Sequence, residues 1–211
     1  MKNSILKTKQ KLALIMIITL SLTVIGSTYA YYFVKMNNNE ELTGTAAEVH
    51  LALEVNRIFP ETEKDNLVPQ LYKEGSTNPL ATALKRKCID ENDNLVCQLY
   101  KITITNDNGT ITEEVNGGMT FYSDNNLSTD ITNVMPNLSW RLVDSTSELG
   151  THNYFRATSS LQNFAQNIKL TPNESKDYYV IIWINETEND QTDVGKSFFG
   201  NVEFNASNGI G

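Results

Sequence analysis

Apolar residues alternate with polar or small ones along short segments of this chain, and this pattern limits the fold more than any other feature. Val49, Leu51, Leu53 and Val55 form one such series, which gives a strand a single apolar face. Short segments of this kind, separated by Gly, Asn, Asp and Pro turns, predict an all-β, jelly-roll-like antiparallel β-sandwich over residues 46–211. Further strands are expected at residues 96–105, 110–115, 118–122, 138–143, 153–158, 166–170, 177–185 and 196–205.

One short helix is expected within the sandwich domain, at residues 79–84. Asn78 precedes it as a candidate N-cap, and Pro79 stands at the first helical position. Both residue types suit those positions because the Asn side chain accepts a free backbone N–H and Pro has none to satisfy.

The N-terminus carries the pattern of a secretory signal peptide. Residues 1–11 are basic, residues 12–25 are apolar, and small residues surround a cleavage site between Ala30 and Tyr31. The sequence therefore predicts an N-terminal hydrophobic signal helix in residues 1–30, which export removes.

An uncleaved membrane anchor is the alternative for the same region. Residues 12–34 are mostly apolar and long enough to span a bilayer, and the lysines before them would stay cytoplasmic. Both interpretations place the rest of the chain outside the cell, in the medium or at the cell surface. Residues 31–45 then form a flexible leader, or the donor strand that the family resemblance described below implies, and only the N-terminal segment is expected to contact a membrane.

The charge distribution argues against a nucleic-acid partner. The 211-residue chain has 17 basic and 25 acidic residues, a net charge of −8. Four of the lysines lie in the first eleven positions, so removal of the signal leaves 13 basic against 25 acidic residues and a net charge of −12. A surface this acidic repels phosphate backbones.

Cys88 and Cys97 are the two cysteines of the chain. In an exported protein, two cysteines this close in sequence usually pair and staple a hairpin or a short loop. Free thiols are the alternative, whereas a redox-active pair is disfavoured because the spacing is not C-x-x-C.

No familiar catalytic or metal-binding motif occurs in the sequence, so neither an enzyme, a cofactor nor a metal site is expected. His50 and His152 are the two histidines, and neither has a zinc-binding spacing. The acidic stretches at residues 90–94 and 186–193 suit polar turns better than calcium loops, because neither matches an EF-hand. Trp140 and Trp183 lie within apolar strands and are expected in the core.

Three stretches of the chain resemble the TasA/camelysin-like family of SipW-dependent exported surface proteins. The region around the cleavage site, residues 26–33 (GSTYAYYF), is similar to the signal region of that family. Residues 97–106 (CQLYKITITN) and 138–142 (LSWRL) resemble strands of its domains. The longest match runs from residue 178 (YYVIIWI) through Gln191, Asp193 and Gly195 to residue 204.

The resemblance implies a jelly-roll-like sandwich, removal of the signal by a dedicated signal peptidase, and self-assembly into extracellular matrix or biofilm fibres. In such fibres the mature N-terminal segment completes the sheet of a neighbouring copy, which is strand addition to a sheet edge. The corresponding donor strand here is Tyr31, Tyr32, Phe33 and Val34, with residues 37–45 as its hinge. A membrane-anchored surface binding module is the alternative function, and an enzyme is the least expected.

Overall fold

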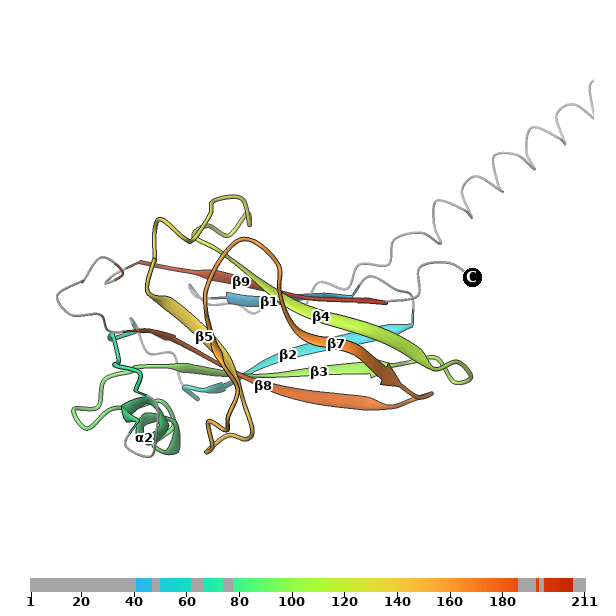
Figure 1. Ribbon diagram of the computed structural model, residues 1–211, viewed down its shortest axis with the longest axis horizontal. Helices are drawn as coiled ribbons and strands as arrows, with labels where there is room; N and C mark the ends of the chain where they lie inside the picture. Colours follow the sequence, from blue (N-terminus) through green and yellow to red (C-terminus); the bar gives the residue numbers. More distant parts are fainter. Residues whose placement is uncertain are drawn as a thin grey trace, which may run out of the picture.

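The computed structural model describes residues 41–46, 50–61, 67–73, 78–185, 193 and 196–206, and these form a sandwich of two β-sheets with one short helix (Figure 1). The all-β prediction is confirmed at this level. The expected signal helix and membrane anchor lie outside the described residues. The elements are β1 (Glu41–Ala46), β2 (Leu51–Phe59), α2 (Pro79–Lys85), β3 (Gln98–Asn106), β4 (Glu113–Tyr122), β5 (Leu138–Val143), β6 (Tyr154–Arg156), β7 (Gln162–Leu170), β8 (Ser175–Ile184) and β9 (Phe199–Ala206).

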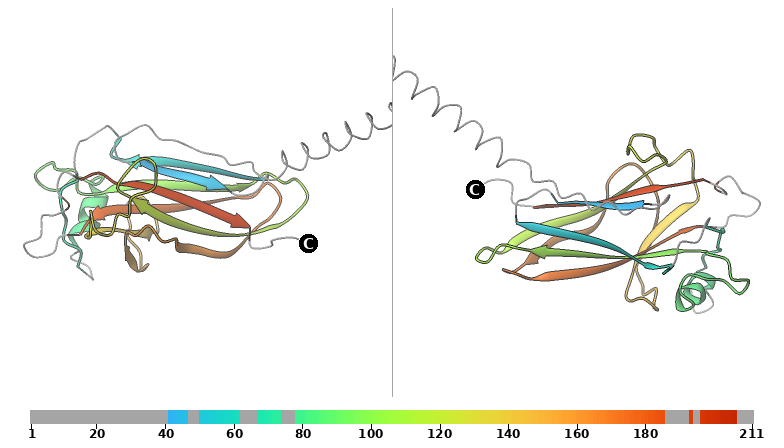
Figure 2. Two further views of the ribbon diagram at one scale, coloured as in Figure 1. Left: turned by 90° about the horizontal axis from the view of Figure 1, so that it is seen from above. Right: turned by 180° about the vertical axis from the view of Figure 1, so that it is seen from behind.

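Most strands that follow one another in sequence lie in opposite sheets. One sheet has four strands in the order β1-β9-β4-β7, and the other has five in the order β2-β3-β8-β5-β6. The chain changes sheet after β1, β3, β4, β6, β7 and β8. All pairs are antiparallel except β1 with β9, which is parallel. Figure 2 shows the two layers from above and from behind.

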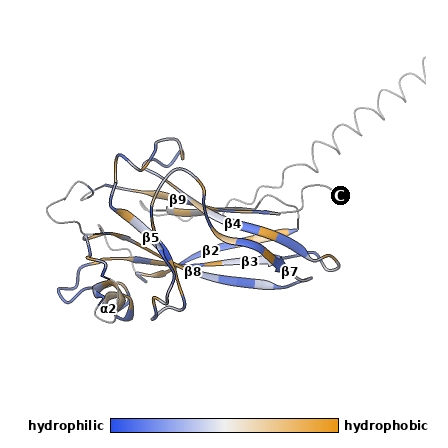
Figure 3. Ribbon diagram, in the orientation of Figure 1, coloured by the Kyte–Doolittle hydropathy of each residue, from blue (hydrophilic) through white to orange (hydrophobic). Residues whose placement is uncertain are grey.

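The core lies between the two sheets and follows the alternation in the sequence. Leu53 and Val55 of β2 stand opposite Ile104 and Ile102 of β3, and all four are buried. The residues between them on β3, such as Thr103, lie on the outer face and are half-buried. Figure 3 shows the corresponding change between apolar and polar positions along the strands.

Helix α2 forms where its local sequence predicted it. The Asn78 side chain accepts a hydrogen bond from Leu80 N at 3.0 Å, and Pro79 opens the helix. Leu80 and Leu84 are buried on one side of it. The helix lies beside the outer face of the five-stranded sheet at one end of the molecule (Figure 1), where Ile181 of β8 is buried.

Apart from shifted strand ends, two regions differ from the sequence-based expectation. Residues 110–115 and 118–122 were expected as separate strands, but Glu113–Tyr122 is continuous, with irregular register against β7 at Gly117 and Gly118. Glycine is needed at position 117 because a Cβ there would lie 2.5 Å from the Phe204 ring. Residues 41–45, expected in a flexible leader or in the hinge of a donor strand, belong to β1 instead. The sandwich therefore begins at Glu41 among the described residues.

Candidate functional site

The edge formed by β1 and β9 is the first candidate site, because it is where the N-terminal strand joins the sandwich. β1 runs parallel to β9, with Leu42 opposite Gly200 and Gly44 opposite Val202. Leu42 is fully buried. Among the described strands β9 is its one pairing partner, so the far side of β1 forms an edge of its sheet.

Gly200 makes room for the Leu42 side chain. A Cβ atom on Gly200 would lie 2.5 Å from Cδ1 of Leu42 and 3.4 Å from the Phe121 ring. Full burial of a leucine side chain contributes about 1.5–3 kcal/mol. Among the side chains that the structure describes in β1, Leu42 is the one that anchors the strand. It fits because Gly200 on β9 has no side chain.

The second candidate site is the α2–disulfide unit, defined here as residues 78–97. Cys88 and Cys97 form a disulfide within it, with both residues fully buried, so the predicted pairing is confirmed. Cys88 N also donates to Ala83 O at 2.8 Å, and Val96 N donates to Cys88 O at 2.9 Å. The helix and the following loop are thereby joined into one body.

Within this unit the acidic stretch 90–94 is a compact polar turn, as the sequence favoured. One carboxylate oxygen of Asp90 accepts hydrogen bonds from Asn92 N and Asn94 N, each at 2.8 Å, and the other accepts from the Asn94 side chain at 3.0 Å. The bond from the Asn94 side chain is the largest of the effects that hold the pKa of Asp90 below its ordinary value. The carboxylate is therefore ionised at neutral pH.

A buried arginine joins two loops on the outer side of the five-stranded sheet. Arg141 of β5 donates to the Tyr72 hydroxyl at 2.9 Å and to the carbonyl oxygens of Leu149 and Gly150, both at 3.1 Å. Its guanidinium also lies 5.8 Å from the centre of the Tyr72 ring. Among the described residues no carboxylate forms an ion pair with Arg141, and its described hydrogen-bond acceptors are all neutral oxygens.

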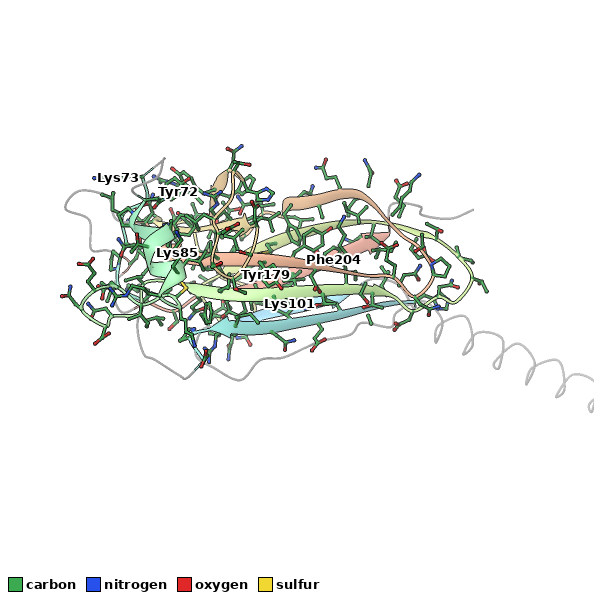
Figure 4. All side chains as sticks on the ribbon, turned by 90° about the horizontal axis from the view of Figure 1, so that it is seen from below. Tyr72, Lys73, Lys85, Lys101, Tyr179 and Phe204 are labelled. Carbon is green, nitrogen blue, oxygen red and sulfur yellow. A yellow bond between two sulfur atoms is a disulfide. The ribbon has the colours of Figure 1, made fainter. Side chains whose placement is uncertain are left out.

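Aromatic residues cover this region. The Tyr72 ring lies 4.9 Å from that of Tyr154 and 5.8 Å from that of Trp183. Trp183 and Trp140 are both fully buried, which confirms their expected place in the core. Figure 4 shows Tyr72 at the α2 end of the molecule, whereas Tyr179 and Lys101 lie further along the sheet.

The two histidines lie in different parts of the molecule, and His152 is in the loop that Arg141 contacts. His50 lies in the turn before β2, and His152 Nε2 lies 3.3 Å from Asp144 Oδ1 in the loop between β5 and β6. Within the residues that the structure describes, no group of three or more His, Cys, Asp or Glu side chains is placed to hold a metal ion.

Several predicted site residues lie outside the described part of the chain. These are Ala30 and Tyr31 at the cleavage site, and the donor-strand candidates Tyr31, Tyr32, Phe33 and Val34. In the described residues no helix has the length and apolar character needed to cross a membrane.

Sequence reasoning missed both Leu42 with Gly200 and Arg141 with Tyr72. Each pair joins residues far apart in the chain, and neither has a local motif. The one available signal was the isolated Arg141 in the apolar strand LSWRLV, because a charged residue in such a strand needs a partner.

Comparison with protein-family models, with curated proteins and with solved structures finds no match to this chain.

Proposed function

We propose that this protein is a secreted, non-enzymatic structural subunit of extracellular matrix or biofilm fibres at a bacterial cell surface. Its sandwich is a jelly-roll variant, which the repeated changes of sheet along the chain support. The buried disulfide supports an oxidising compartment outside the cytoplasm. The principal partner is a further copy of the same chain, after a signal peptidase has released the N-terminus at Tyr31.

The observation that carries the proposal is the position of β1. It is the first described strand, it lies at the edge of its sheet, and it pairs in parallel with β9. Residues 47–50 connect it to β2 in the opposite sheet. A terminal strand at an edge can be exchanged between copies with every native contact kept, because the neighbour supplies the same strand.

Assembly proceeds by donation of the N-terminal strand of one copy to the β9 edge of the next. Leu42 of the donor enters the space above Gly200 of the acceptor, as it does within one chain. The predicted donor segment, residues 31–34, ends six residues before β1 in the sequence, so exchange of β1 carries it to the neighbour as well. Repetition of the same head-to-tail contact produces a fibre.

Mixed cysteine cross-linking tests this assembly. One tagged chain carries Leu42→Cys and a second, differently tagged chain carries Gly200→Cys, since these positions are direct partners in the register. Under conditions that form fibres, visible by electron microscopy, the two tags should become joined by a disulfide.

The matched control uses Thr105→Cys in one chain and Ser175→Cys in the other. These positions are partners between the interior strands β3 and β8, so strand donation predicts no cross-link between them. Failure of the exported protein to polymerise would contradict the fibre function. Fibres without the cross-link between positions 42 and 200 would contradict the donation step alone.

Export itself is tested by the N-terminal sequence and intact mass of the protein from culture medium and cell wall. A start at Tyr31 in the medium is expected. A chain that keeps its N-terminus in the membrane fraction would favour the anchored binding module.

A further inference from the structure

A pocket of about 380 Å³ opens beside α2, between the helix and the disulfide loop, which is residues 88–97. Its volume lies within the range of small-molecule sites, about 300–1,000 Å³. The donation of β1 makes no use of it. Its polar lining consists of Gln70, Thr82, Arg86, Asp90, Glu91 and Asn92.

The polar groups of the pocket are of mixed kind. The guanidinium of Arg86 only donates hydrogen bonds, whereas the carboxylates of Asp90 and Glu91 only accept them when ionised. The side chains of Gln70 and Thr82 do both. A ligand that satisfies this lining must present donors and acceptors together, as a set of hydroxyl groups does.

The charge of the lining selects against an anion. One cation, Arg86, stands against two carboxylates, Asp90 and Glu91. Hydrogen bonds within its own turn, foremost that from the Asn94 side chain, lower the pKa of Asp90, so this carboxylate stays ionised at neutral pH. The chain as a whole carries a net charge of −8, which adds to the repulsion of an anionic ligand.

Apolar surface completes the pocket. Pro79 and Ala83 of α2 and Ile89 of the disulfide loop line it together with the polar groups. The lining is thus more polar than that of most small-molecule sites, whose walls are mainly apolar. The apolar residues suit a molecule that has C–H surface between its hydroxyl groups.

The disulfide and backbone hydrogen bonds hold the segments that carry the lining residues. The Cys88–Cys97 disulfide closes the loop that carries the acidic residues, and Asp90 N donates to Asn94 O at 3.0 Å. On the other side, Gln70 N donates to Ile184 O of β8 at 2.9 Å, which ties Gln70 to the sheet. A preformed site loses less conformational entropy on binding than one that must order its walls.

We propose that this pocket binds a neutral saccharide unit of a polysaccharide. The ligand's hydroxyl groups accept from Arg86 and donate to Asp90 and Glu91, while its C–H face packs against Pro79 and Ile89. The protein thereby binds a polysaccharide through the α2–disulfide unit, at a site separate from the β1–β9 edge. The proposal goes beyond the fibre function and does not depend on it.

Titrations followed by ¹H–¹⁵N NMR test the site in the exported, monomeric protein. The probes are maltotriose, cellotriose and chitotriose, with trigalacturonate as the anionic comparison. At least one neutral trisaccharide should shift the resonances of residues 79–92 at concentrations up to about 10 mM, the range of weak single-site binding. Arg86→Gln and Glu91→Gln should each weaken that binding by about tenfold, the effect of losing roughly 1.4 kcal/mol.

Lys85→Gln is the matched control, because Lys85 is an exposed neighbour in sequence that does not line the pocket. It should leave the affinity unchanged. Arg86 and Glu91 are also exposed, so their variants should keep the wild-type NMR spectrum elsewhere. The absence of a resonance shift with every neutral trisaccharide would overturn the proposal. So would an affinity that is unchanged in both Arg86→Gln and Glu91→Gln. Tighter binding of trigalacturonate than of every neutral trisaccharide would also overturn it.

Discussion

The side chain of Leu42 in β1 occupies the space that a side chain on Gly200 in β9 would need, since a Cβ there would lie 2.5 Å from Leu42 Cδ1. The two residues are direct partners in the parallel register. The pairing of β1 with β9 therefore requires both the Leu42 side chain and the lack of a side chain at position 200. This complementarity explains how a strand with one described buried side chain holds its place.

Gly200→Ala should consequently displace Leu42 and destabilise the protein by about 1–3 kcal/mol, as overpacking of a core does. Leu42→Ala should cost about 2–5 kcal/mol through the cavity that it leaves. The double variant should be more stable than the sum of the two effects predicts, because the alanine on β9 then fills part of the space. Urea unfolding of the four proteins measures this coupling, and strictly additive effects would contradict the contact.

The Cys88–Cys97 disulfide closes a loop with a sequence separation of 9. Constraint of the unfolded chain by a loop of this size is worth about 2–3 kcal/mol. Cys88→Ala combined with Cys97→Ala should lower the free energy of unfolding by that amount. Urea unfolding of the oxidised, reduced and substituted proteins provides the measurement. Reduction without any loss of stability would contradict the structural role.

The sequence predicts those parts of the fold that depend on residues close together in the chain. Asn78 and Pro79 define the start of α2 by their own hydrogen-bonding chemistry, and no distant residue is needed. Alternation in residues 51–55 likewise gives β2 one buried face whatever its neighbours are. The two cysteines were close enough in sequence for pairing to be the expected result.

The parts that it could not predict depend on distant partners. Glu41–Ala46 contains Leu42 as its one large apolar residue. The strand therefore forms because β9 has an edge to pair with and Gly200 leaves room for Leu42. Residues 116–117 were expected to separate two strands, yet β4 runs through them and the Phe204 ring occupies the space beside Gly117. In both cases packing between strands outweighs local propensity.

Arg141 provides a prediction about the loop between β5 and β6. Arg141→Met should leave the Tyr72 hydroxyl and the carbonyls of Leu149 and Gly150 without their donor. Loss of these bonds in a buried place should cost about 2–4 kcal/mol. Tyr72→Phe, which removes one acceptor and keeps the ring, should cost about 1 kcal/mol.

Urea unfolding of both variants measures the cost, and hydrogen exchange of the amides in residues 144–152 locates it. Exchange in that loop should rise in Arg141→Met more than in Tyr72→Phe. A Met variant as stable as the wild type would show that the buried charge makes no net contribution, as found where apolar replacements pack well.

Stability should decrease in acid because carboxyl groups accept hydrogen bonds in the folded protein. Five of them have a lowered pKa: Asp90, Asp124, Asp130, Glu174 and Asp177. A group with a lowered pKa in the folded state contributes stability that is complete above its unfolded pKa and is lost as the pH falls through its folded pKa. For the aspartates this loss begins near the ordinary value of 3.8.

The contribution of Asp177 to the pH dependence of stability can be tested separately. Its pKa is lowered first by the hydrogen bond from Lys101, whose Nζ lies 2.9 Å from Oδ2, and then by the bond from Thr103 at 2.7 Å. The same pair raises the pKa of Lys101 above its ordinary value of 10.5. The stability that Lys101 contributes is therefore complete below pH 10.5 and is lost as the pH rises through its folded pKa.

Asp177→Asn should therefore be less stable than the wild type at neutral pH, by a small amount because the pair is exposed to solvent. The difference should shrink both in acid below pH 3.8 and in alkali above pH 10.5, the ordinary values of the two groups. Urea unfolding across this pH range tests both limits, with Glu148→Gln as the control for loss of an exposed carboxylate elsewhere. A difference between wild type and Asp177→Asn that stays constant with pH would mean that the ion pair does not couple protonation to folding.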